Sequence, residues 1–372
     1  MVVAEPDQSL GADQVKPVEN FSSSSSDKKR KQHGKSKKKR SGKEGKAMKS
    51  YRLVHFSELP EYMKDNQYIL RYYRSDWPLS RAFLSLFTIH NETLNIWTHL
   101  LGFLLFLGLT IMHLDGVPKL SEIISHLPWS ISTGSSGNVS CSNGNFSNGV
   151  ASLIKLGTSM SSELLPDHHS SPPTARWPFF VFLAGSMFCL LTSSICHLFC
   201  CHSHRLNIFL SRLDYIGIAV MIVASFFPPI YYIFQCDHRW QITYLASITI
   251  MGLFTVLNLL SPHLSTGACR TYRAMLFVAM GLSGVIPAVH ATAVNWNESR
   301  RPVTLAYEIA MAMSYLTGTF FYVSRIPERW KPGWFDLTGH SHQIFHLFVI
   351  GGALAHYGAA LIFLEWRDTV AC

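Results

Sequence analysis

His342 and His346, four residues apart, have the spacing of a metal-binding pair. Positions i and i+4 of an α-helix lie on one face, about 6 Å apart, so both imidazoles can reach one ion. His197, in another apolar segment, can supply a third nitrogen. Three neutral imidazoles leave the fourth position of a tetrahedral zinc site open for water, which is typical of catalytic zinc. The sequence therefore predicts that His197, His342 and His346 bind Zn²⁺, although each can also be a hydrogen-bonded core histidine.

Asp214 and Ser193 are candidate catalytic residues beside this site. Asp214 can accept a hydrogen bond from a zinc-bound water and act as a general base. Ser193 lies one helical turn before His197, where its hydroxyl can orient the water or stabilise an oxyanion. Simpler roles remain open. Asp214 can instead pair with Arg212 or Arg205, and Ser193 can bond a carbonyl of its own helix.

The other histidines are weaker candidates. His202 and His340 lie close to the proposed ligands in sequence and can orient them. His90 and His99 flank the start of an apolar segment and are expected to pack as polar core residues. His356 lies fourteen residues beyond His342, about 21 Å along a helix, so it cannot share the same ion.

The eight cysteines do not have the spacing of a disulfide framework. Cys141 and Cys236 fall in connecting segments on the predicted outer side and can form a disulfide bond there. Three more cysteines crowd one helix end, where packing and palmitoylation are better explanations than metal binding. These are Cys196, Cys200 and Cys201.

Seven apolar segments must position these side chains. They are Leu94–Met112, Trp177–Cys196, Leu213–Phe234, Ile242–Leu260, Met275–Val294, Leu305–Ser324 and Ile344–Trp366. About 20 apolar residues cross ~30 Å of hydrocarbon, and the backbone of such a segment can pair its polar groups only as a helix. Charged residues make up only 15% of the chain, against about a quarter in soluble domains. The sequence predicts an all-α integral membrane protein, a bundle of seven transmembrane helices, with kinks at Pro228, Pro229 and Pro287.

Basic residues determine the predicted orientation. Lysines and arginines concentrate in the first 50 residues and in the segments 202–212, 261–274 and 325–341, which are therefore expected in the cytosol. The N-terminus is then cytosolic, and the C-terminus is extracellular or luminal. Glycosylation sequons on the expected outer side agree with this orientation. They begin at Asn138, Asn145 and Asn297. His197, Asp214 and the His342–His346 pair then all lie near the cytosolic ends of their helices.

The chain divides into four predicted parts. They are a disordered basic tail (1–50), a juxtamembrane interfacial segment (51–90), the seven-helix transmembrane domain (91–366) with a long outer loop (114–176), and a short outer tail (367–372). The basic tail is expected to attract anionic lipid of the inner leaflet. Its basic run resembles a nuclear-import signal, but the rest of the chain cannot leave a membrane, and no nucleic acid partner is expected.

Several motifs resemble the progestin and adipoQ receptor family, in order, over about residues 51–366. They are His90–Leu100 (HNETLNIWTHL), Ser193–His197 (SSICH), Cys201–Ser203 (CHS), Leu213–Gly217 (LDYIG), Pro327–Arg329 (PER) and Ser341–His346 (SHQIFH). Glu61–Asn66 and Tyr72–Arg74 resemble its plant branch, the heptahelical transmembrane proteins related to adiponectin receptors. The resemblance implies a cytosolic N-terminus, zinc bound by the three histidines, and Asp214 in contact with a zinc-bound water. The long 114–176 segment departs from the adiponectin-binding members, so their ligand is not carried over.

Two functions are expected from this resemblance. The first is an adiponectin-receptor-like signalling receptor in hormone or stress responses, with cytosolic signalling partners that the sequence does not identify. The second is a zinc-dependent hydrolase of lipid amides such as ceramide, and the two can coexist. The plasma membrane and the endoplasmic reticulum both fit such a protein, and the sequence does not indicate an oligomeric state.

Overall fold

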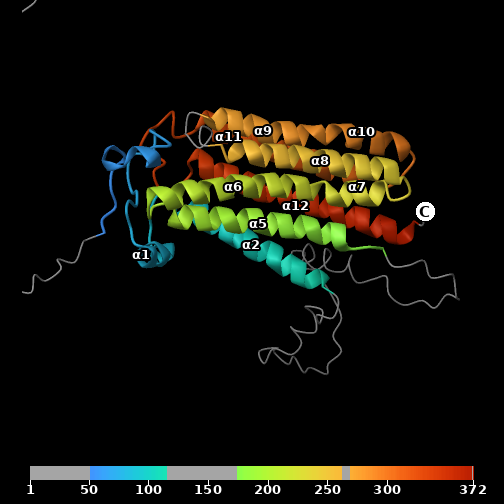
Figure 1. The fold of residues 1–372 in the computed structure, drawn as a ribbon, viewed down its shortest axis with the longest axis horizontal. Coiled ribbons are helices and arrows are strands. Elements are labelled where there is room, and N and C mark those ends of the chain that lie inside the picture. The colour runs from blue at the N-terminus through green and yellow to red at the C-terminus, as the bar shows by residue number, and fades with distance from the viewer. Residues whose placement is uncertain (1–50, 115–173, 262–268, 371) are drawn as a thin grey trace, which may run out of the picture. The chain divides into compact units, whose positions relative to one another are not determined.

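Long α-helices make up most of the protein. The computed structural model describes residues 51–114, 174–261, 269–370 and 372. The helices of the bundle are α2 (Thr93–His113), α5 (Trp177–Phe199), α6 (His204–Ser225), α7 (Phe227–Ile233), α8 (His238–Leu259), α9 (Arg270–Ser283), α10 (Val285–Val294), α11 (Arg301–Ser324) and α12 (Ser341–Thr369) (Figure 1). The predicted basic tail and nearly all of the predicted outer loop lie outside the described residues.

Six helical segments within the described residues are long and apolar enough to cross a membrane. They are α2, α5, α6 with α7, α8, α9 with α10, and α12. Helix α11 is equally long, at 24 residues, but Glu308 and several hydroxyl-bearing residues make it less apolar. The prediction of a multi-pass helical membrane protein is therefore confirmed, while the seventh span and the orientation of the termini stay predictions.

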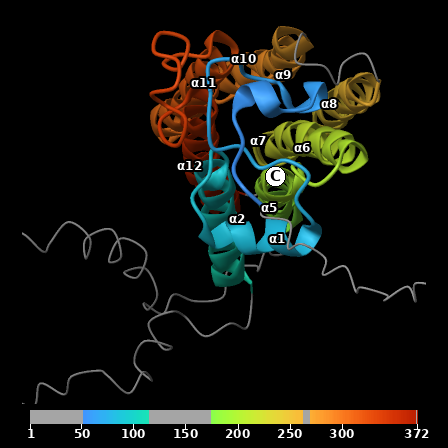
Figure 2. The ribbon, with the colours of Figure 1, turned by 90° about the vertical axis from the view of Figure 1, so that its left-hand side faces the viewer.

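The long helices form a closed ring. Along the chain α2, α5, α6, α8, α9, α11 and α12 each pack against the next, and α12 also packs against α2 (Figure 2). Large apolar side chains fill the space between α2, α5 and α12. Phe106 and Phe182 meet edge to face there, with ring centroids 6.2 Å apart, beside the fully buried Ala353. Ring closure brings the first and last helices together, which places α12 next to residues far away in sequence.

Two of the membrane segments are broken near their prolines, as predicted. Helix α6 ends at Ser225 and α7 begins at Phe227, just before Pro228. Helix α9 ends at Ser283 and α10 begins at Val285, just before Pro287. Proline has no backbone N–H and clashes with the carbonyl four residues earlier, so helical bonding is interrupted there.

Residues 51–92 pack at the end of the bundle where α5 ends and α12 begins (Figure 1). They form short helices, η1 (Phe56–Glu58), η2 (Glu61–Met63), α1 (Leu79–Leu84) and η3 (Ser85–Phe87). Residues of η1 and η2 pack against a small core of Leu59, Ile69 and Tyr73, while α1 packs against α5. Asn66 donates a 3.0 Å hydrogen bond to the buried carboxylate of Glu328, in the α11–α12 connection. These contacts tie the segment to the connection that leads into α12.

A disulfide bond joins Cys236 to Cys372. The predicted pairing of Cys236 with Cys141 is therefore wrong, and Cys141 itself lies outside the described residues. The reason is the packing of α12 against α7, which brings the far end of α12 to the α7–α8 connection that contains Cys236. At the other end of the bundle Cys196 and Cys201 are buried, as expected for packing, while Cys200 is half-buried.

Candidate metal centre

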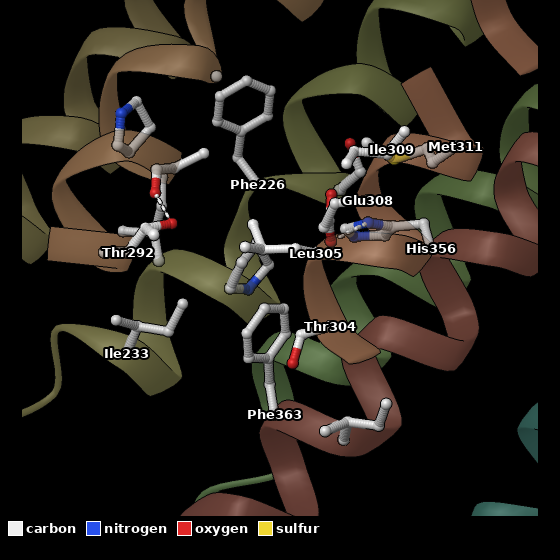
Figure 3. Close-up of a pocket in the computed structure, with 18 of the residues that line it drawn as sticks. Phe226, Ile233, Thr292, Thr304, Leu305, Glu308, Ile309, Met311, His356 and Phe363 are labelled. Atoms are coloured by element: carbon white, nitrogen blue, oxygen red, sulfur yellow. Dashed lines mark hydrogen bonds and ion pairs between the residues drawn. The ribbon is translucent and has the colours of Figure 1, made fainter. Parts of the chain in front are cut away.

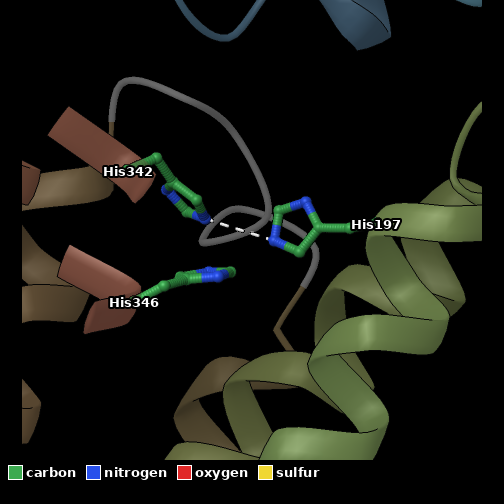
Figure 4. A group of neighbouring side chains, drawn as sticks. All are labelled: His197, His342 and His346. Atoms are coloured by element: carbon green, nitrogen blue, oxygen red, sulfur yellow. Dashed lines mark hydrogen bonds between the residues drawn. The ribbon is translucent and has the colours of Figure 1, made fainter. Parts of the chain in front are cut away.

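Three histidines converge between α5 and α12. His197 belongs to the last turn of α5, and His342 and His346 belong to the first two turns of α12 (Figure 4). One ring nitrogen of each lies within 4.8 Å of the others. Nε2 of His342 lies 3.2 Å from Nε2 of His197. The predicted ligand set is therefore brought together by residues 145 positions apart in sequence.

The spacing of the His197 and His342 nitrogens fits a small divalent cation, and a nitrogen of His346 lies within 4.8 Å of both. Zinc binds histidine at 2.0–2.1 Å in tetrahedral geometry, which separates two ligand nitrogens by about 3.3 Å. The observed 3.2 Å between His197 and His342 is close to that value. Nitrogen ligands suit zinc and its transition-metal neighbours better than magnesium or calcium, which prefer oxygen. The residues present therefore fit the metal that the sequence predicts.

Hydrogen bonds orient two of the three rings. Nδ1 of His197 donates to Oε2 of Glu92 at 2.7 Å, and Nδ1 of His346 donates to the carbonyl of Asn95 at 3.2 Å. Both rings then direct the Nε2 lone pair toward the cluster. A carboxylate or carbonyl behind a ligand histidine fixes its tautomer and strengthens it as a ligand.

Glu92 is a functional residue that the sequence analysis missed. It precedes α2, and Nδ2 of Asn95 donates to its carboxylate at 2.6 Å. Burial alone raises the pKa of Glu92, but the His197 imidazole and the hydrogen bond from Asn95 together hold it below its usual range. Glu92 is therefore a carboxylate positioned to accept from His197. The motif that contains it, HNETLN, was noticed only for its family resemblance.

Asp214 and Ser193 lie beside the cluster but are not part of the three-ligand group. A side-chain hydrogen bond joins Ser193 on α5 to Asp214 on α6. Ser193 is 2% exposed and Asp214 is half-buried. The two helices approach closely near this level, since a Cβ on Gly217 would lie 2.6 Å from the hydroxyl of Thr192. The structure thus places both predicted catalytic residues next to each other, and their chemical roles stay predictions.

The remaining histidines at this end of the bundle have other partners. His99 is buried and stacks on His346, with ring centroids 3.6 Å apart, as expected for polar packing. His202 bonds to the carbonyl of Trp77 at 2.8 Å, and His340 lies 3.4 Å from the carbonyl of Asn91. His202 and His340 therefore hold the juxtamembrane segment and the start of α2.

Arg74 is a second residue that the sequence analysis missed. Its side chain is 2% exposed and donates to the carbonyls of His197 and Leu198, at 2.7 and 3.0 Å. The last carbonyls of a helix have no partner within the helix, so such a donor stabilises its end. Arg74 therefore fixes the turn of α5 that carries His197.

A family described as Haemolysin-III related matches residues 87–357 of the chain. This span includes Glu92, both predicted catalytic residues and all three histidines. The chain belongs to the haemolysin-III and adiponectin-receptor family.

Several plant members of this family are similar to the chain over most of its length. The chain is 59% identical to Heptahelical transmembrane protein ADIPOR1 of Oryza sativa subsp. japonica, over 87% of each chain. It is 53% identical to Heptahelical transmembrane protein 1 of Arabidopsis thaliana, over 88% of this chain and 86% of that protein. The Adiponectin receptor protein of Drosophila melanogaster is 34% identical over 83% of this chain and 59% of its own length. Membership of the haemolysin-III and adiponectin-receptor family agrees with the multi-pass helical fold.

Proposed function

We propose that the protein is an adiponectin-receptor-like signalling receptor of seven membrane-spanning helices, acting in hormone or stress responses, with a zinc site near the cytosolic ends of its helices. The convergence of His197, His342 and His346 carries this proposal. The name of the Drosophila relative, Adiponectin receptor protein, supports the receptor class, and the plant relatives support a heptahelical membrane protein.

In the receptor the zinc site joins α5 to α12. These helices contribute His197 and the His342–His346 pair but share little direct packing compared with their other neighbours. A metal bound there holds the two helix ends at a fixed separation. Movement at the opposite end of the bundle then pivots about this point. The protein functions in the plasma membrane or the endoplasmic reticulum, its basic tail attracts anionic lipid, and unidentified cytosolic partners receive the signal.

The Ser193–Asp214 hydrogen bond favours a second function, hydrolysis of a lipid amide of the ceramide class. Bound zinc would supply a Lewis acid and a water of lowered pKa. Asp214 would accept a proton from the attacking water and return it to the leaving amine. While Asp214 is protonated it no longer needs the Ser193 proton, and the Ser193 hydroxyl would then donate to the developing oxyanion. One water and one amide give one fatty acid and one amine. Hydrolysis can itself be the way in which the receptor signals.

Metal content and turnover separate these functions. The full chain is purified in detergent, zinc per chain is measured by elemental analysis, and fatty acid release from ceramide is followed. We expect one zinc per wild-type chain, loss of zinc in His342→Ala, and retention of zinc in Asp214→Asn. The exposed His238→Ala and Asp237→Asn variants serve as matched controls.

Each result has a definite meaning. Turnover that is lost in both His342→Ala and Asp214→Asn would establish a hydrolase. Stoichiometric zinc without turnover in any sample would refute ceramide hydrolysis and favour a receptor whose metal is structural or an enzyme with another substrate. A folded wild-type protein that binds no zinc would refute the zinc site in either function.

A further inference from the structure

A cavity of about 370 Å³ lies among α7, α10, α11 and α12 (Figure 3). Its walls are almost entirely apolar and include Phe226, Ile233, Leu305 and Phe363. Ligand pockets typically have volumes of roughly 300–1,000 Å³ and apolar walls with a few polar groups. One wall residue, His356, lies ten residues beyond His346, about 15 Å along α12. The cavity is therefore separate from the metal centre.

An ionisable pair lies in the wall of this apolar cavity. Nδ1 of His356 on α12 is 3.1 Å from Oε1 of Glu308 on α11 (Figure 3). The His356 side chain is 2% exposed and that of Glu308 is 26% exposed. Ionisable groups within membrane helices are energetically costly and by default indicate function.

The pair retains hydrogen-bonding capacity. Among the residues that the structure describes, neither ring nitrogen of His356 has a hydrogen-bond partner, and Oε1 of Glu308 has none either, so the 3.1 Å separation is an ion-pair distance without hydrogen-bond geometry. A hydroxyl group both donates and accepts, so it can bond to this pair in any protonation state that the carboxylate and the imidazole share. An uncharged hydroxyl also enters an apolar cavity at a much lower cost than a charged group does. The chemistry of the pair therefore selects an alcohol.

The end of the cavity near the start of α11 is polar and carries positive charge. Arg300 lines the cavity at the start of α11, and its Nη1 is buried without a hydrogen-bond partner in the described part of the chain. The N-terminus of α11 adds positive potential there. The neighbouring Glu298 carboxylate already accepts from Trp366 Nε1 at 3.1 Å and from the backbone of Arg300 at 3.3 Å. Arg301 also lines this end of the cavity, so two arginines outweigh the single carboxylate of Glu298 and an anionic group of a ligand fits beside Arg300.

We propose that this cavity binds a small amphiphilic hydroxy acid, with its carboxylate at Arg300, its apolar body against the cavity walls and its hydroxyl at the Glu308–His356 pair. Arg300 and Glu308 are eight residues apart, about 12 Å along α11, which sets the length of the ligand between its two polar ends. The site uses none of the residues of the metal centre, and it exists whether that centre signals, hydrolyses lipid or only holds two helices together.

Binding of 10-hydroxydecanoate to the full chain in lipid nanodiscs tests the site. Two probes of the same length each lack one polar end: decanoate lacks the hydroxyl, and 1,10-decanediol lacks the carboxylate. We expect one saturable site for the hydroxy acid and at least about tenfold weaker binding of the other two, because each loses one hydrogen-bonded contact. Equal binding of all three probes would mean partition into lipid and would overturn the proposal.

Variants of the cavity test separately which residue binds the hydroxyl of the ligand and which binds its carboxylate. In Glu308→Leu the hydroxy acid should bind no better than decanoate, and in Arg300→Gln it should bind no better than the diol. The exposed Glu365→Leu and Arg239→Gln variants are controls in which both preferences should persist. A preference that survives in the cavity variants, or disappears in the controls, contradicts the assignment.

A variant that fills the cavity tests the site without changing a polar residue. Ala288 lines the cavity on α10, and Ala288→Phe should abolish binding of all probes while leaving zinc content and thermal stability near wild type. His342→Ala should leave probe binding within about twofold. Binding that survives Ala288→Phe but disappears in His342→Ala would place the ligand at the metal centre instead.

Discussion

The carboxylate of Glu92 accepts a 2.7 Å hydrogen bond from Nδ1 of His197, a residue 105 positions later in the chain. Glu92→Gln removes the charge that strengthens His197 as a ligand, so we expect zinc affinity to fall 10–100-fold. Competition with a fluorescent zinc chelator measures this affinity. The exposed Glu365→Gln should bind zinc as the wild type does. Unchanged affinity in Glu92→Gln would show that the hydrogen bond has no influence on the metal.

Gly185 on α5 packs closely against α6. A Cβ at this position would lie 2.4 Å from Cβ of Ala224, so Gly185→Ala must push the two helices apart. We expect a loss of about 1–3 kcal/mol in stability, as for other overpacked cores. For Gly108 on α2 there is no atom within 4 Å of the added carbon in the described part of the chain, and Gly108→Ala should be neutral or slightly stabilising. Thermal unfolding in detergent compares the two, and equal melting temperatures would refute the packing argument.

The burial of a neutral His90 predicts that the folded protein loses stability in acid. Its Nδ1 accepts from the backbone N–H of Glu92 at 3.1 Å and its Nε2 donates to the carbonyl of Ser85 at 3.2 Å, which requires a neutral ring. Burial, together with the positive charge of Arg74, lowers the pKa of His90 from 6.5 to about 4. The unfolded chain takes up this proton first, so stability falls as the pH drops from 6.5 toward 4, by up to roughly 3 kcal/mol.

The variant His90→Gln isolates this contribution from those of other acidic and histidine groups. Glutamine keeps a donor and an acceptor but does not titrate, so the difference in stability between wild type and variant should shrink as the pH falls from 7 to 5. Chemical denaturation in detergent at several pH values measures the difference. A constant difference across this range would show that His90 does not remain neutral in the folded protein.

The predicted orientation is testable with sealed microsomes, whose cytosolic face is outermost. Trypsin should remove an epitope tag fused before Met1, because the lysine-rich segment 28–49 is then exposed to the protease. A tag fused after Cys372 should survive until detergent opens the vesicles. The reverse pattern would invert the bundle and place the histidine cluster near the luminal face.

The sequence predicted the membrane segments well because a span must be apolar over a nearly fixed length. It missed the start of α6, which begins at His204 rather than at Leu213. The first two turns of this helix carry polar side chains that extend past the hydrocarbon, and apolarity does not detect helix there. Helix α11 is less apolar than the six membrane-length segments because it carries Glu308, four residues or about one turn beyond Thr304.

The histidine cluster was predictable because two of its members have the i, i+4 spacing and all three lie at the same end of the predicted bundle. Glu92 and Arg74 were not predictable from spacing, since each acts on His197 from a separate segment that docks against the end of the bundle. His356 is too far along α12 to join the cluster, as expected. Its partner Glu308 lies on another helix, and only the packing of α11 against α12 brings the two together.

The breaks before α7 and α10 have a mechanical consequence. Residues from both short helices line the cavity, whereas the opposite wall is formed by α11 and α12, which are continuous. A helix bends most easily where its hydrogen-bonded ladder is interrupted. Helix α10 can therefore bend at Gly284 relative to the stiff back wall, whereas α7, although interrupted at Phe226, is tied to the end of α12 by packing and by the Cys236–Cys372 disulfide bond. The width of one half of the bundle can change while the other half, with its histidines, keeps its shape.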